Sequence, residues 1–116
     1  MHFENINQAK KELVEAILSE YISVLIDDDR VQEIKIKKAY KIQYYIEENF
    51  DLKEMKDLLS HDIARVRVWA AKMLLPIYEE IALKVLDDIS KSKIPHCSSD
   101  ARIIYCEWKN EPISFD

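Results

Sequence analysis

Two short runs of residues have side chains that could perform chemistry. Ser60, His61 and Asp62 supply the three residue types of a hydrolytic triad, and His96 next to Cys97 could form a thiolate pair. Triads are assembled from separate segments, because three consecutive residues cannot align nucleophile, base and orienting group. We therefore interpret residues 60–62 as helix-capping residues, and we predict no enzyme, no catalytic residue and no cofactor.

The two cysteines, Cys97 and Cys106, fall in a segment that we expect to be helical. Nine residues of helix would place them on opposite faces and about 13 Å apart, beyond the roughly 7 Å limit between Cα atoms for a disulfide. His61, His96 and these cysteines do not have the spacing of a zinc finger or ribbon. We predict buried thiols, with neither a disulfide nor a metal site.

Composition narrows the function further. The 116 residues include no glycine, which excludes the glycine-rich loops that cradle phosphates or dinucleotides. Twenty-two Asp and Glu against 17 Lys and Arg give a net charge of −5, which makes nucleic acid an unlikely partner. The N-terminal residues lack the pattern of a secretory signal, and no apolar run could span a bilayer. We expect a single cytoplasmic domain over residues 1–116, with no membrane partner.

Apolar residues recur at intervals of three and four, and no sustained alternation indicates a strand. The pattern predicts an all-α fold of about six antiparallel helices. The expected ranges of the first five are 7–24, 30–48, 52–59, 63–75 and 77–90, and the sixth is expected to reach about residue 109. The acidic run 27–29 should cap the second helix, Pro76 should open the fifth, and Ser98, Ser99 or Asp100 should cap the sixth.

The same spacing predicts which side chains are buried. In the first helix Ile22 widens the apolar stripe, and in the second helix Ile34 points inward. Trp69 is expected in the core. In the fifth helix the inward residues are expected to be Ile77, Ile81, Val85 and Ile89.

Residues 61–76 resemble a HEAT-type repeat. Such repeats carry an Asp near the start of the first helix, a Val-Arg pair one turn later, an Ala-Ala pair and then an aliphatic residue. The matching residues are Asp62, Val66, Arg67, Ala70, Ala71 and Leu74. Over residues 58–108 the chain is similar to a family of small bacterial proteins of unknown function that fold as a short HEAT-like α-α superhelix, although Asn110 stands where such families often have glycine. The resemblance implies a fold and no reaction.

The outward side of the fifth helix is the main candidate for binding. Glu80, Lys84, Asp87 and Lys91 are spaced to form one stripe, with Asp88 beside it. In a HEAT-like array, this helix would line the concave surface. Trp108, near the end of the array, is a further candidate for partner binding.

We therefore expect a protein that binds another protein through this stripe. Because an acidic surface steers basic partners, one role would be that of an immunity protein that neutralises a basic bacterial toxin. A HEAT-like nucleic-acid-binding or DNA-repair protein is an alternative, with a channel built from the lysines at 35–41 and Arg65, Arg67 and Arg102. Another is a homo-oligomeric scaffold that pairs through Trp108.

Overall fold

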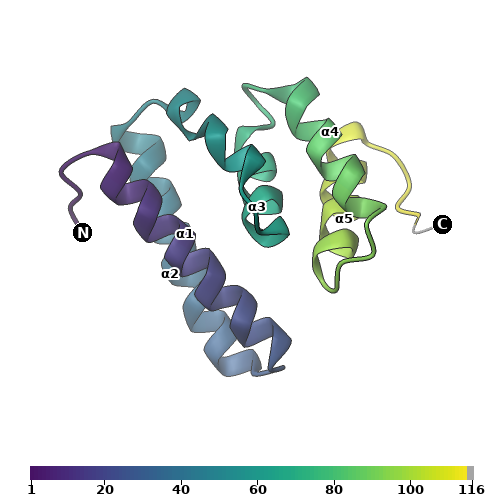
Figure 1. The fold of residues 1–116 in the computed structure, drawn as a ribbon, viewed down its shortest axis with the longest axis horizontal. Helices are drawn as coiled ribbons and strands as arrows, with labels where there is room; N and C mark the ends of the chain where they lie inside the picture. The colour runs from purple at the N-terminus through teal and green to yellow at the C-terminus, as the bar shows by residue number, and fades with distance from the viewer. Residues whose placement is uncertain (115–116) are drawn as a thin grey trace. The chain divides into compact units, whose positions relative to one another are not determined.

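The computed structural model describes residues 1–114, whose regular elements are helices, with no strand among them. The all-α class and the number of helices are therefore confirmed. The elements are α1 (Ile6–Leu25), α2 (Asp29–Asn49), the 3₁₀ helix η1 (Leu52–Ser60), α3 (Ala64–Leu74), α4 (Glu79–Ser90) and α5 (Cys97–Lys109) (Figure 1). Within residues 1–114 no helix combines the length and apolar character that crossing a membrane requires.

The chain divides into two compact units. Unit 1 covers Met1–Met55 and unit 2 covers Lys56–Asp116. The single domain expected over residues 1–116 stays a prediction, and its last two residues lie outside the described part.

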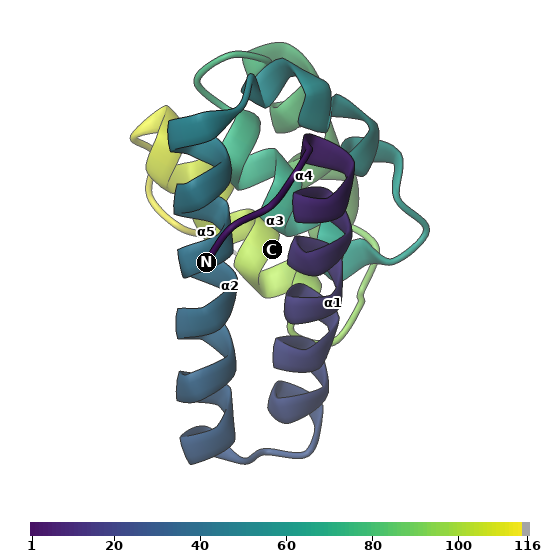
Figure 2. The same ribbon diagram turned by 90° about the vertical axis from the view of Figure 1, so that its left-hand side faces the viewer.

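Unit 1 is a helical hairpin in which α1 and α2 lie side by side and antiparallel (Figure 2). Leu13 and Ile17 of α1 and Ile42 and Ile46 of α2 are fully buried. Asp28 caps α2, because its carboxylate accepts a hydrogen bond from the Val31 amide at 3.1 Å. The predicted acidic cap of this helix is confirmed.

Two isoleucines of the hairpin do not lie where the apolar pattern places them. Ile22 and Ile34, expected to be inward, are 59% and 68% exposed. At about 100° per residue, Ile22 lies about 180° around α1 from buried Leu13, and Ile34 lies about 140° around α2 from buried Ala39. The hairpin buries a narrower stripe than the sequence suggests.

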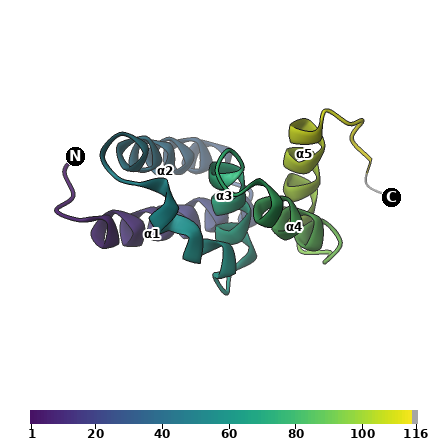
Figure 3. The same cartoon turned by 90° about the horizontal axis from the view of Figure 1, so that it is seen from above.

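In unit 2, α3, α4 and α5 all contact one another, and α4 lies beside α5 (Figure 3). Arg65 of α3 donates to a carboxylate oxygen of Asp100 in α5 at 2.6 Å, which ties these two helices together. Cys97 and Cys106 are buried and unbridged, as predicted. Trp69 is half-buried, whereas the sequence predicts a core position.

The predicted caps at the start of α3 are wrong. Ser60 ends η1, and the N-cap of α3 is Ile63, whose side chain makes no capping bond. The His61 ring accepts a hydrogen bond from the Ile63 amide at 3.1 Å. Arg67 instead fastens this turn, because its guanidinium donates to the backbone carbonyls of His61 at 2.7 Å and Asp62 at 3.0 Å.

The start of α4 also differs from the prediction. Pro76 does not open the helix, because the Leu74 carbonyl accepts bonds from the Ile77 and Tyr78 amides and the turn continues as far as Tyr78. Helix α4 then begins at Glu79.

The buried row of α4 is Ala82, Leu86 and Ile89, not the row that begins at Ile77. Ile77 and Ile81 are exposed, and Val85 is half-buried. The inward positions predicted at Ile77 and Ile81 are therefore wrong, while the one at Ile89 is confirmed.

The sixth predicted helix, α5, starts at Cys97, and its N-cap His96 has a left-handed backbone with φ of 63°. Ser98 does not cap it in the expected way. Its hydroxyl accepts from the Ile94 amide at 2.8 Å and donates to the Ile89 carbonyl at 2.7 Å, so it fastens the loop before α5 to the end of α4.

Candidate protein-binding face

The charged stripe predicted on the fifth helix lies on α4 and at the residue that follows it. Glu80, Lys84, Asp88 and Lys91 are exposed, and Asp87 is partly covered. Helix α4 itself carries four carboxylates, at Glu79, Glu80, Asp87 and Asp88, against the one cation Lys84. The helix is therefore locally acidic.

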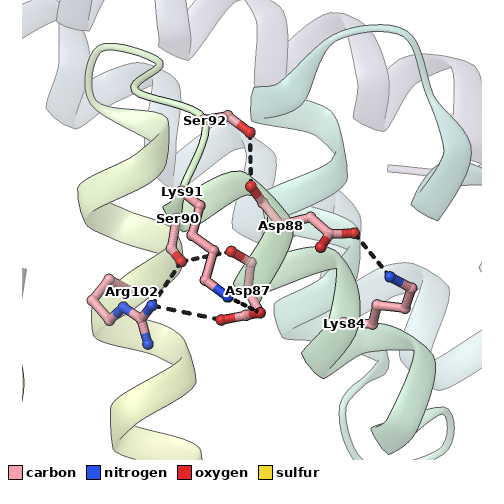
Figure 4. A network of polar contacts seen from close by, with 7 residues as sticks. All are labelled: Lys84, Asp87, Asp88, Ser90, Lys91, Ser92 and Arg102. Atoms are coloured by element: carbon pink, nitrogen blue, oxygen red, sulfur yellow. Dashed lines mark hydrogen bonds and ion pairs between the residues drawn. The ribbon is translucent and has the colours of Figure 1, made fainter.

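Three cations hold the carboxylates at the C-terminal end of α4 (Figure 4). Lys91 Nζ lies 2.9 Å from Asp87 Oδ2, and Lys84 Nζ lies 3.3 Å from Asp88 Oδ2. Arg102 Nη2, from α5, lies 3.6 Å from Asp87 Oδ1. The negative end of the helix dipole disfavours carboxylates at this position, and these cations offset that effect.

Two serines bind the backbone carbonyls of the same two aspartates. The Ser90 hydroxyl donates to the Asp87 carbonyl at 2.7 Å and accepts from Arg102 at 3.0 Å. The Ser92 hydroxyl donates to the Asp88 carbonyl at 2.7 Å (Figure 4). Because Arg102 bridges α5 to both Asp87 and Ser90, the end of α4 is held in one arrangement.

Trp108 is 41% exposed and lies beside the opposite end of α4. Its indole Nε1 donates to Glu79 Oε2 at 2.9 Å. At about 100° per residue, Glu79 lies about 140° around α4 from Lys84. The structure therefore does not bring Trp108 into the charged row.

The row contains an apolar residue that the sequence reasoning placed in the core. Ile81 is 42% exposed and precedes Lys84 by three residues and Asp88 by seven, so the three share one side of the helix. We call Glu80, Ile81, Lys84, Asp88 and Lys91 the α4 face. Ile81 could not be found from spacing, because the apolar residues of α4 fit two alternative inward rows.

The alternative basic channel is not assembled within either unit. In unit 1, Lys37 is paired with Glu33 at 3.1 Å. Lys35 and Lys38 line a hollow that they share with Glu12 and Glu15. In unit 2, Arg65 and Arg102 bind the carboxylates of Asp100 and Asp87. Acidic neighbours thus accompany most of these cations, which weakens attraction to phosphates.

Among residues 1–114, no three His, Cys, Asp or Glu side chains gather in an arrangement that could hold a metal ion. Comparison with known proteins found no matching family model, no similar curated protein and no similar solved structure. A functional proposal therefore has to start from the exposed residues of the α4 face.

Proposed function

We propose that this chain is a non-enzymatic protein-binding module whose α4 face, with the adjacent Asp87, contacts the partner. The observation that supports it most is an exposed isoleucine within a row of exposed charges on an ordered helix. Interfaces combine a buried apolar anchor with a polar rim in this way. Trp108, on the side of α4 near α5, would contribute at the edge of the contact.

A binding partner could replace one member of an ion pair on the α4 face. An exposed pair such as Lys84 with Asp88 contributes only about 0–1 kcal/mol to stability, so a partner can replace one member at little cost. Arg102 and Ser90 hold Asp87 in place before any partner arrives. This preorganisation lowers the entropy lost on binding.

The carboxylates of Glu80, Asp87 and Asp88 favour a partner that presents lysine or arginine side chains. More specifically, we propose that the chain is an immunity protein that neutralises a basic toxin. A HEAT-like repeat formed by α3 and α4 is a further part of it. The contacts of Arg67 with the carbonyls that precede α3, and the burial of Ala70 and Ala71, support that part.

Affinity capture from the native host tests the proposal. The wild-type chain is compared with the double variant Glu80→Lys, Ile81→Ser, which alters two exposed residues of the α4 face. Glu107→Lys is the matched control, because it reverses an exposed charge on α5 outside that face. A protein retained by the wild type and by the control, but lost from the double variant, supports the proposal.

Two results contradict the proposed function. One is a captured protein that all three chains retain equally. The other is salt-sensitive retardation of nucleic acid at low salt without a protein partner, which would favour the nucleic-acid alternative.

A further inference from the structure

A hollow of about 220 Å³ lies on unit 1 between α1 and α2. Its charged lining is divided by helix: Glu12 and Glu15 come from α1, and Lys35 and Lys38 come from α2. None of these four side chains forms an ion pair or a hydrogen bond with another residue of 1–114. Two carboxylates and two ammonium groups thus face one hollow without a partner.

The same side of the hairpin becomes apolar toward its tip. Ile22 follows Glu15 by seven residues, Ile26 follows Ser19 of the lining by seven, and Ile34 precedes Lys38 by four. At these spacings each isoleucine continues the row that lines the hollow. All three are strongly exposed, with Ile26 at 65%. We call the four charged residues and these three isoleucines the hairpin flank.

The hairpin flank is complementary to itself in one orientation. A two-fold axis parallel to the two helices would place α1 of each copy over α2 of the other, because the helices lie side by side and antiparallel (Figure 2). The carboxylates would then face lysines, and the apolar tips would face each other. An axis across the helices would set α1 on α1, with carboxylate against carboxylate.

Other occupants fit the hairpin flank less well. A basic protein would meet Lys35 and Lys38, and an acidic protein or a nucleic acid would meet Glu12 and Glu15. A matching surface must place lysines opposite the carboxylates of α1 and carboxylates opposite the lysines of α2. A second copy of the same hairpin, turned about the two-fold axis, does this. We propose that a second copy of this chain docks on the hairpin flank and forms a symmetric dimer through α1 and α2.

The test uses the full chain and two charge reversals. Variant A carries Glu12→Lys and Glu15→Lys, and variant B carries Lys35→Glu and Lys38→Glu. Each variant gives its hairpin flank a single sign, so it should repel its own copy. A mixture of the two restores opposite charges on both helices, so it should associate. Variant C, Glu47→Lys with Glu48→Lys, is the control, because it changes net charge as variant A does but at exposed residues of α2 outside the hairpin flank.

Sedimentation velocity and light scattering give the association state. The expected result is a dimer for the wild type and variant C, monomers for A and for B alone, and a dimer in the equimolar mixture of A and B. Circular dichroism checks that each variant keeps its helices. Ile34→Ser, at a position exposed in the single chain, should weaken the wild-type dimer at least about tenfold without altering the monomer.

Three results would overturn the proposal. The first is a wild-type chain that stays monomeric up to about 100 μM, a concentration at which a micromolar pair would be formed. The second is a dimer that variants A, B and Ile34→Ser all leave intact. The third is a mixture of helical variants A and B that remains monomeric.

Discussion

Replacing Lys93 with glycine should stabilise unit 2. Lys93 has a left-handed backbone with φ of 56°, and its exposed side chain forms no hydrogen bond or ion pair among residues 1–114. A residue with a Cβ atom loses roughly 1–2 kcal/mol in this conformation, because Cβ crowds the next carbonyl oxygen. Glycine avoids that clash, so the substitution relieves strain and removes no hydrogen bond or ion pair.

The expected gain is the strain relieved minus the entropy that glycine adds to the unfolded chain. That entropy amounts to about 0.5–1 kcal/mol. The difference leaves Lys93→Gly more stable by about 0.5–1 kcal/mol. For a chain of this length the gain corresponds to about 2–4 °C in the midpoint of thermal unfolding.

Urea denaturation and thermal melts followed by far-ultraviolet circular dichroism measure this effect. Lys93→Ala is the control, because it removes the same side chain and keeps the Cβ atom, so its stability should match that of the wild type. His96→Gly, at φ of 63°, should behave like Lys93→Gly, and Asn110→Gly, at φ of 56°, should gain less because asparagine tolerates this conformation. A Lys93→Gly protein no more stable than Lys93→Ala would refute the reasoning.

Three further substitutions test how the helices are held. Asp28→Ala removes the cap of α2 and should cost about 1 kcal/mol in urea denaturation, while an unchanged midpoint would mean that the bond to Val31 contributes nothing. Leu86→Ala empties a fully buried position of α4 and should lower the free energy of unfolding by about 2–5 kcal/mol; a loss below 1 kcal/mol would argue against a close-packed site. Arg67→Ala removes two charge-assisted bonds before α3 and should lower the free energy of unfolding by about 1–2 kcal/mol in the same measurement. An unchanged free energy would contradict this, because it would mean that water replaces both bonds without loss.

Local signals in the sequence predict the helices well. Helices α1 and α2 each begin and end within one residue of the expected positions, since apolar spacing and the Asp28 cap are properties of neighbouring residues. Helix α3 ends near Pro76, as expected, although the residue before the proline, Leu75, keeps an α-helical backbone with φ of −48° and ψ of −44°. These features need no knowledge of tertiary contacts.

Tertiary contacts decide what the sequence reasoning misses. In α4 both the row from Ile77 and the row of Ala82, Leu86 and Ile89 are apolar at helical spacing, and only the packing of α3 and α5 against α4 selects the second. The bond from Arg102 to Asp87 depends on the same approach of α5. The sequence thus predicted the charged residues of the candidate site. It did not predict that Ile81 is exposed among them or that Arg102 binds Asp87.

The distribution of chromophores and thiols between the two units has a practical consequence. Both tryptophans and both cysteines of the chain belong to unit 2, and unit 1 contains neither. Indole fluorescence and alkylation of Cys97 and Cys106 therefore report on unit 2 alone, whereas amide absorbance follows both units. Without any engineered label, a mismatch between these signals during denaturation would reveal that the hairpin melts separately from the rest of the chain.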